Sequence, residues 1–395
     1  MSDETLIRTP CLVDSRVVRG GDLALVVQRD GARATVIDTG DYAATTKRWP
    51  GVPMMQADAV SPRFINAHTH LDLSAYPALA LDFPQFILAL ARHRRLHPQA
   101  RGVVAADTGL QQLLAQRICA VGDIVAREPV LLAQLGHSPA AGVAYWEVIC
   151  THQASAAATL AQLAQRLPLW RKQQRPDGPR LGLSPQSPYL VCKDVLRALA
   201  QWSMAEGLPL QIHVAESPHE LEFFRSGGGA LAQALQQTFN KPPKPATLGF
   251  RADPGLTPVR YLAEIGFLDA APTLVHAVNV SDEDIRIIAQ YGCAVVTCPR
   301  SNAHLRCGVF PWQKFVQAGV PIALATDSMA SAHSLDLRAE LAAAFDAFGP
   351  DFQLPMALDW LTRGGARALG LAPATIDVGS SLDSLTTINL RAAAA

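Results

Sequence analysis

The stretch Phe64-Ile65-Asn66-Ala67-His68-Thr69-His70-Leu71 joins a short apolar run to two histidines in alternate positions. Successive side chains of an extended chain point to opposite faces, so we expect His68 and His70 to point the same way. Two imidazoles on one side of a strand end can bind one cation together. The pair alone is a weak signal, because a histidine at a strand end is more often a structural residue. Its meaning therefore depends on the rest of the chain.

Seven more short apolar runs follow this stretch, and segments with apolar residues at helical spacing lie between them. The pattern predicts eight strands, at residues 63–68, 118–125, 141–149, 180–184, 209–215, 273–278, 293–298 and 321–326. Eight strands that alternate with helices are what a (β/α)8 TIM barrel of the α/β class requires. The alternative is an open doubly wound sheet, which needs a glycine-rich turn after its first strand, and this chain has no such turn there.

Polar residues occupy the ends of four of these predicted strands. His68 and His70 end the first strand, His213 and Glu216 the fifth, His276 the sixth and Asp327 the eighth. Catalytic groups of a TIM barrel lie at the carboxyl ends of its strands. Each residue alone has a structural explanation, such as a helix cap for Asp327. Their joint occurrence at four strand ends predicts a metal-dependent active site.

The first 60 residues follow a different pattern. The runs at residues 23–27 and 34–37 are short, rich in β-branched residues and separated by Gly and Asp. This pattern predicts a small β unit in front of the barrel. Residues 226–257 are also unusual, because they are Gly-rich at the start and Pro-rich in the middle. That segment is too long for an ordinary barrel connection and predicts a lid over the fifth strand, with a passive insertion as the alternative.

Composition limits the partners of the chain. It has 34 basic and 34 acidic side chains, so its formal net charge is zero and gives no electrostatic reason to bind nucleic acid or an anionic membrane. No run approaches the ~18–20 apolar residues that span a bilayer, and the first residues lack the features of a signal peptide. Seven scattered cysteines without a C-x-x-C motif indicate reduced structural thiols. We expect a cytoplasmic protein with a small-molecule ligand, no nucleic-acid or membrane partner, and a homodimer as one option.

Five motifs together resemble the amidohydrolase superfamily. They are the stretch quoted above, His213-Val214-Ala215-Glu216, Leu274-Val275-His276, Cys298-Pro299-Arg300-Ser301-Asn302 and Ala325-Thr326-Asp327-Ser328. The resemblance covers roughly residues 60–370. Within the superfamily, the motifs resemble the branch of adenosine-deaminase-like and chlorohydrolase-like aminohydrolases, which bind one metal. Within that branch the sequence looks most like the bacterial 6-aminodeoxyfutalosine deaminases. The resemblance implies a small β-sandwich-like domain of residues 1–60 and 370–395 beside a barrel of residues 61–369.

The same resemblance implies roles for the residues at the strand ends. One divalent metal is held by His68, His70, His213 and Asp327, while Glu216, His276 and Asp327 are catalytic. Three neutral imidazoles and one carboxylate suit Zn²⁺, with Fe²⁺ as second choice. Binuclear members carry a modified lysine at the end of the fourth strand, where this chain has no lysine, so one metal is expected. The cytidine-deaminase type of zinc site needs H-x-E and P-C-x-x-C, and the chain has neither.

The predicted function is metal-dependent hydrolytic deamination of an adenine-type nucleoside or related N-heterocycle. The leading substrate is 6-aminodeoxyfutalosine, an intermediate of menaquinone biosynthesis, and adenosine and methylthioadenosine are close alternatives. A second enzyme class, hydrolysis of a cyclic amide or an aryl chloride, would use the same metal site. A third hypothesis is a catalytically inactive barrel that acts as a binding protein. It is disfavoured because Glu216 and all expected metal ligands are present.

Six residues near the strand ends are predicted to bind substrate. They are Asp72, Ser74, Ser187, Tyr189, Arg300 and Asn302. Arg300 is the candidate for an anionic group such as a benzoate-like carboxylate, because arginine binds carboxylates with two parallel hydrogen bonds. The structural alternative is a loop or cap hydrogen bond for Asp72 and Asn302, and a turn for Arg300. The tail at residues 378–390 lacks the Gly-Lys-Ala-Asp-Leu segment usual in relatives, so its fold is left open.

Overall fold

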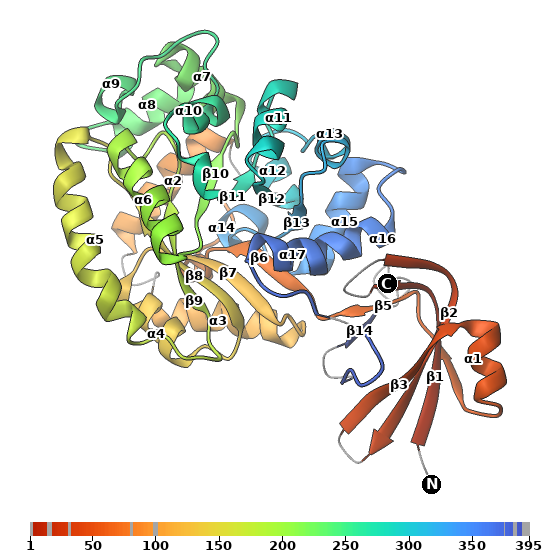
Figure 1. Cartoon of the computed structure of the whole chain (residues 1–395). Coiled ribbons are helices and arrows are strands. Elements are labelled where there is room, and N and C mark those ends of the chain that lie inside the picture. Colours follow the sequence, from red (N-terminus) through yellow and green to blue (C-terminus); the bar gives the residue numbers. More distant parts are fainter. Residues whose placement is uncertain are drawn as a thin grey trace.

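The computed structural model describes residues 3–13, 18–30, 33–79, 82–97, 102–374, 376–381 and 385–388. All eight predicted barrel strands are present, with helices arranged around them (Figure 1). The strands are β6 (Ile65–Thr69), β7 (Ala120–Val125), β8 (Ala141–Val148), β9 (Arg180–Pro185), β10 (Gln211–Val214), β11 (Thr273–His276), β12 (Ala294–Thr297) and β13 (Ile322–Leu324). Most of their residues are buried on both faces, which explains why the sequence has continuous apolar runs there.

The barrel consists of two parallel four-stranded sheets that meet at two seams. One sheet has the order β6-β7-β8-β9 and the other β10-β11-β12-β13. A parallel bridge between Leu183 and Leu210 joins β9 to β10. A second bridge, between Thr69 and Asp327, joins the end of β6 to the segment that follows β13. At the second seam, the Asp327 backbone N–H donates to the His68 carbonyl at 3.2 Å. The ring is therefore closed, and its closure brings the first and last strand ends together.

Helices that cover the barrel follow its strands along the chain (Figure 1). The longer ones are α2 (Phe83–Leu96), α3 (Val103–Ala115), α4 (Glu128–His137), α5 (Ala156–Arg171), α6 (Lys193–Glu206), α7 (Pro218–Ser226), α11 (Asp282–Gln290) and α15 (Leu337–Phe348). Shorter ones are α12 (Pro299–His304), α13 (Trp312–Gln317), α14 (Met329–Ala332), α16 (Leu354–Asp359) and α17 (Gly365–Ala368). In the described part of the chain, no helix combines the length and the apolar character needed to cross a membrane.

The segment at residues 226–257, predicted to be a lid, is largely helical. It contains α8 (Gly229–Thr238) and α9 (Pro245–Leu248), and α10 (Pro258–Glu264) follows it directly. Leu231 and Leu235 of α8 are fully buried. This helix packs against α2 and α7, so the insertion supports its neighbours on the outside of the barrel.

A separate sheet of six strands lies on one side of the barrel (Figure 1). Its path is β14-β5-β1-β2-β3, with β4 paired to β1. The strands are β1 (Asp3–Val13), β2 (Val18–Asp30), β3 (Arg33–Asp41), β4 (Met54–Gln56), β5 (Ala59–Pro62) and β14 (Leu385–Ile388), and α1 (Tyr42–Arg48) packs on β2 and β3. The predicted runs at 23–27 and 34–37 lie inside β2 and β3, whereas β1 and α1 were not predicted. The tail does return to this sheet, because β14 pairs with β5 in antiparallel register.

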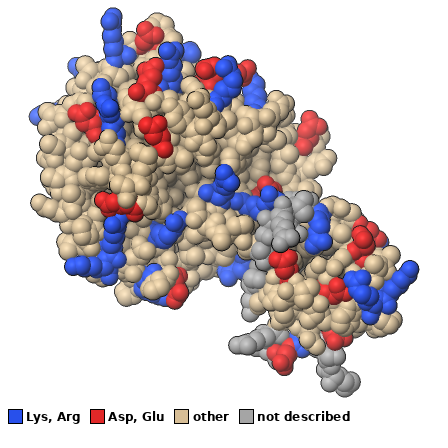
Figure 2. Space-filling view, viewed as in Figure 1, with Lys and Arg blue, Asp and Glu red and all other residues tan. Residues whose placement is uncertain are grey.

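The surface agrees with the balanced charge of the sequence. On the face shown in Figure 2, basic and acidic side chains are interspersed over both the barrel and the small sheet. Several form ion pairs, such as Arg171 with Glu206 at 2.7 Å and Lys314 with Asp282 at 2.6 Å. All seven cysteines are free thiols, and six of them are buried.

Candidate active site

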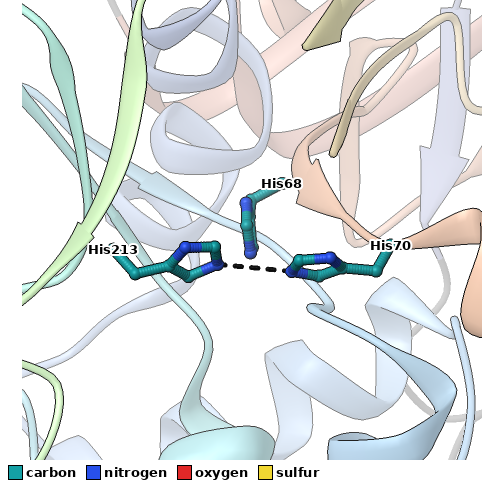
Figure 3. Close-up of side chains that lie close together, drawn as sticks. All are labelled: His68, His70 and His213. Carbon is teal, nitrogen blue, oxygen red and sulfur yellow. Dashed lines mark hydrogen bonds between the residues drawn. The ribbon is translucent and has the colours of Figure 1, made fainter. Parts of the chain in front are cut away.

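Three imidazoles converge at the carboxyl ends of β6 and β10. His68 lies near the end of β6, His70 directly follows that strand, and His213 lies near the end of β10. Each contributes one ring nitrogen, and these nitrogens all lie within 4.8 Å of one another. The Nε2 atoms of His70 and His213 are 3.2 Å apart, with the His68 ring between them in Figure 3. The predicted histidine pair thus forms part of a group of three nitrogen donors.

Asp327 joins this group from the opposite side of the barrel seam. Its Oδ1 lies 3.6 Å from His68 Nε2 and 3.7 Å from His70 Nε2. Ser301 and Ser331 donate their hydroxyl groups to its Oδ2 at 2.6 and 2.9 Å. The backbone of Asp327 has a φ of 57°, a strained conformation for a residue other than glycine. The two serines therefore hold Oδ2, while Oδ1 accepts the Ser328 backbone N–H at 2.7 Å and faces the imidazoles.

Hydrogen bonds to Nδ1 set the tautomers of two of the rings. His213 Nδ1 lies 2.8 Å from the backbone carbonyl of Gln186, which can only accept, so this nitrogen carries the proton. His68 Nδ1 lies 2.7 Å from Gln211 Oε1, and the amide group of Gln211 donates to the Ala67 carbonyl at 3.2 Å. Burial lowers the pKa of His213 to about 3, which keeps its ring neutral. In both rings the lone pair is consequently on Nε2, which points into the group.

This donor set fits a divalent metal ion. The Nε2 atoms of His70 and His213 face each other at 3.2 Å, and a cation between such nitrogens removes the repulsion of their lone pairs. His68 Nε2 is buried and has no hydrogen-bond partner. Ring orientation by a hydrogen bond to the second nitrogen is also typical of histidines that bind metals. The residues present can therefore hold one metal ion, as expected for three imidazoles and a carboxylate.

Glu216 and His276 form a second pair beside the imidazoles. Glu216 follows β10 after Ala215, whose φ of 50° turns the chain sharply there. Its Oε1 lies 3.5 Å from His276 Nε2, and His276 Nδ1 lies 3.0 Å from Asn302 Oδ1. Burial, together with the charges of Asp327 and Glu220, raises the pKa of Glu216 well above its usual value. Burial lowers the pKa of His276 to about 4, so burial favours the protonated form of the carboxyl group and the neutral form of the imidazole.

Glu220 holds the backbone of Glu216 in position. It lies on the first turn of α7, is fully buried, and accepts the Glu216 backbone N–H at 2.9 Å through Oε2. Asn279 donates to the Glu216 carbonyl at 2.8 Å from the other side. Ser217 caps the same helix by accepting the Glu220 N–H at 3.3 Å. The sequence pattern indicates Glu216 but gives no sign that this second glutamate fixes it.

A cavity opens next to these groups, and α2 forms one of its walls. The described residues that line it are His70, Leu73, Phe83, Phe86, Ile87, Leu90, Arg94, Glu147, Gln186, Tyr189, His213, Glu216, His276, Leu305, Asp327 and Ser328. The lining combines the candidate metal ligands with apolar side chains, an arrangement typical of small-molecule sites. The insertion at residues 226–257, predicted to cover the site, contributes none of these residues, and α2 takes that place.

The six predicted substrate-binding residues are placed differently from one another. Of these six, Tyr189 alone is among the described residues that line the cavity. Asp72 and Ser187 are fully buried, and Ser74 packs so closely on α3 that a Cβ at Gly109 would lie 2.1 Å from its Oγ. Asn302 bonds to His276, as described above.

Arg300 is engaged in contacts within the fold. Its Nη1 donates to the Ser334 side chain at 2.8 Å and backbone carbonyl at 3.2 Å, and lies 3.7 Å from buried Glu340. Its backbone N–H also donates to Glu340 at 3.1 Å. The guanidinium thus ties α12 to α15 and is absent from the described lining of the cavity.

Several site residues were missed by the sequence analysis. Gln211 precedes His213 by two positions and so shares its face of β10, where a polar residue in a buried strand is a usable signal. Gln186 holds His213 through its backbone, which no residue type reveals. Phe86 and Arg94 lie on α2, whose approach to the cavity depends on how the chain crosses the barrel mouth.

Comparison with known proteins identifies the family. The Amidohydrolase family matches residues 59–383. The aminodeoxyfutalosine deaminase of Deinococcus radiodurans is 43% identical over 338 residues, covering 85% of this chain and 79% of that protein. The 5-methylthioadenosine/S-adenosylhomocysteine deaminase of Nitratidesulfovibrio vulgaris is 26% identical over 399 aligned positions, covering 93% of this chain and 83% of that protein.

A solved structure has the same architecture. Helicobacter pylori aminofutalosine deaminase, in complex with methylthio-coformycin, superimposes with a TM-score of 0.74 and 22% identity, covering 98% of this chain and 92% of that one. The closed parallel barrel and the strand-end imidazoles agree with these similarities. The chain belongs to the amidohydrolase family. The resemblance seen in the five sequence motifs is thereby confirmed.

Proposed function

We propose that this chain hydrolytically deaminates an adenine-type nucleoside, and that its substrate is 6-aminodeoxyfutalosine in menaquinone biosynthesis. The observation that carries the reaction class is the pair of Glu216 and His276, whose facing atoms lie 3.5 Å apart beside the three imidazoles. The choice of substrate rests on the 43% identity with the aminodeoxyfutalosine deaminase of D. radiodurans. That identity extends over most of both chains.

We assign one divalent metal ion to His68, His70, His213 and Asp327. Zn²⁺ is the first choice and Fe²⁺ the second, because neutral imidazoles with one carboxylate suit both metals. When bound, the metal acts as a Lewis acid that makes a water molecule nucleophilic near neutral pH. The described end of β9 offers no lysine to hold a second ion, which supports a single metal.

Glu216 supplies the proton that deamination requires. Burial raises its pKa and so favours the protonated carboxyl group, which can donate to a ring nitrogen as water attacks the adjacent carbon that bears the amine. His276 keeps its Nε2 lone pair free of a proton, because Nδ1–H is donated to Asn302. Nε2 can therefore accept a hydrogen bond from the attacking water. Asp327 accepts one proton of the water and passes it to the amine, which leaves as ammonia. The remaining hydroxyl proton returns to Glu216 as the new carbonyl group forms.

Substrate contacts divide into direct and indirect ones in this proposal. Tyr189 contacts the substrate, because it lines the cavity. Asn302 acts through His276, and Arg300 acts by tying α12 to its neighbours. Asp72, Ser74 and Ser187 shape the segments after β6 and β9. We further propose a cytoplasmic enzyme without nucleic-acid or membrane partners. Its residues 1–60 and 370–395 form the small domain, and its candidate oligomeric state is a homodimer.

The test is ammonia release by zinc-loaded protein from a panel of compounds. The panel contains 6-aminodeoxyfutalosine, methylthioadenosine, adenosine, adenine, a cyclic amide and an aryl chloride. Elemental analysis of the same sample should give one metal ion per chain. Highest kcat/KM on 6-aminodeoxyfutalosine supports the proposal, whereas turnover confined to the cyclic amide or the aryl chloride refutes it. No turnover of any compound by protein with one bound metal would favour a binding protein.

A further inference from the structure

One face of α2 forms a continuous wall of the cavity. The face consists of Phe83, Phe86, Ile87, Leu90 and Arg94. Phe86 and Ile87 are neighbours on one turn, and the turns before and after them contribute a residue three or four positions away. Asp82 caps the helix by accepting the Gln85 N–H at 3.1 Å, which fixes where the helix begins. On its outer side α2 packs against α8 of the insertion. The wall is thus a defined helical surface and has four apolar side chains before its single charged one.

Arg94 is the one Lys or Arg side chain among the described residues of the cavity lining. Apart from histidines, the other titratable lining side chains that can carry charge near neutral pH are the carboxyl groups of Glu147, Glu216 and Asp327. Arginine binds carboxylates and phosphates with two parallel hydrogen bonds, so a guanidinium group in this lining is suited to an anionic group on the ligand.

The spacing along α2 indicates the shape of that ligand. Arg94 follows Phe83 by eleven residues, a rise of about 16 Å in an α-helix. Phe86, Ile87 and Leu90 occupy the interval and offer an apolar surface. A ligand that contacts the whole wall therefore has an apolar or aromatic portion and an anion beyond it. 6-Aminodeoxyfutalosine has this form, because its adenine nucleoside carries a benzoate group.

We propose that Arg94 binds the carboxylate of the substrate and selects carboxylated adenine nucleosides over neutral ones. The inference rests on the proposed deamination and names the residue behind its specificity. Arg300, which the sequence suggested as the anion-binding residue, contacts Ser334, between α14 and α15, and Glu340 of α15. Arg94 binds no reacting atom in this proposal, so its effect falls on substrate affinity.

The matched variants are Arg94→Met and Arg95→Met. Arg95 is the next residue on α2, is exposed, and does not line the cavity in the described residues. Each zinc-loaded protein is assayed with 6-aminodeoxyfutalosine, methylthioadenosine and adenosine monophosphate, and its melting temperature is measured. We expect Arg94→Met to raise KM for 6-aminodeoxyfutalosine at least tenfold and to change kcat/KM for methylthioadenosine less than threefold. Arg95→Met should change neither.

The remaining outcomes separate the alternatives. Equal losses on 6-aminodeoxyfutalosine and methylthioadenosine, or no loss on either, would overturn the role of Arg94. If the wild-type protein prefers adenosine monophosphate and Arg94→Met abolishes that preference, the proposal that Arg94 binds a carboxylate is wrong. Its ligand would then be a phosphate group. Calorimetric titration with futalosine, the deaminated product, gives a second measurement, and Arg94→Met should weaken its binding at least tenfold. Wild-type protein that deaminates no nucleoside would overturn the proposed function itself.

Discussion

At the scale of single residues, the site depends on partners that hold each functional group in one protonation state. His213 and His276 both have Nδ1 engaged by an oxygen acceptor, so both present Nε2 without a proton. Glu216 is buried beside other carboxylates, which raises its pKa and favours its protonated form. Neutral imidazoles beside a neutral carboxylic acid are what metal binding and proton donation each require.

Glu216→Gln should retain the metal and the fold but lose about 10²–10⁴-fold in kcat, because it removes an acid without removing a ligand. The measurement is steady-state deamination, with metal content and melting temperature recorded for the same preparation. A variant that keeps more than about a tenth of the wild-type kcat would show that another group supplies the proton.

Glu220 gives the molecule a measurable pH dependence of stability. Burial raises its pKa from 4.5 to about 8, although hydrogen bonds from the Glu216 and Ala215 backbone oppose the shift. An acid with a raised pKa in the folded state contributes stability that is complete below 4.5 and is lost as the pH rises to about 8. Glu220→Gln removes this titration, so its melting temperature should rise relative to wild type between pH 5 and pH 8.

The control for that measurement is Glu222→Gln on the same helix. Glu222 is exposed, so its variant should follow the wild-type pH profile. Parallel profiles for wild type and Glu220→Gln would contradict the assignment. The glutamine variant should keep most activity, because its amide oxygen still accepts the Glu216 N–H.

The sequence predicted the site residues that are visible as exceptions to a local pattern. His68, His70 and His213 each interrupt an apolar run, and the barrel rule then brings strand ends together. The partners that orient them could not be predicted in the same way. The Gln211 contact to His68 joins residues 143 positions apart, and the contact exists because the ring closes between β9 and β10.

At the scale of elements, the barrel strands could be predicted from the sequence, but the helix that covers the active site could not. Parallel strands buried on both faces leave a continuous apolar signal, which marks all eight of them. The segment at residues 226–257 has the glycines and prolines of a loop, yet α8 forms within it and buries Leu231 and Leu235. Helices that pack on helices are decided by tertiary contacts, so composition could not indicate that α8 supports α2 while α2 lines the cavity.

Helix α12 links two parts of the catalytic group. It carries Ser301, which bonds to Asp327, and Asn302, which bonds to His276. Arg300 anchors the same helix through Ser334 and Glu340. Arg300→Met should therefore lower kcat for 6-aminodeoxyfutalosine and for methylthioadenosine by the same factor, and should lower the melting temperature.

This outcome distinguishes Arg300 from Arg94 in a single assay. A loss confined to the carboxylated nucleoside in Arg300→Met would return the anion-binding role to Arg300. A loss shared by both nucleosides supports the anchoring role. The two variants thus distinguish a residue that contacts the substrate, Arg94, from a residue that anchors α12, Arg300.

At the scale of the whole molecule, the small sheet and the active site lie at opposite ends of β6. Strand β5 leads into the amino end of β6, whereas His68 and His70 lie at its carboxyl end. The sheet is completed by β14, which pairs with β5 over Leu385–Ile388. The six-stranded order of the sheet was beyond prediction, because β14 is separated from β5 by more than 300 residues of barrel.

Truncation after Ser381 tests this separation, because it removes β14 and leaves every described site residue in place. Loss of one strand's hydrogen bonds should lower the melting temperature by roughly 3–10 °C. The kcat/KM for 6-aminodeoxyfutalosine should stay within about threefold of wild type at 25 °C, since the described residues that line the cavity all belong to the barrel. Thermal denaturation and steady-state kinetics on the same preparation provide the two measurements. A large fall in kcat/KM with an unchanged melting temperature would mean that the tail acts on the site directly, and the small sheet would then be part of the catalytic unit.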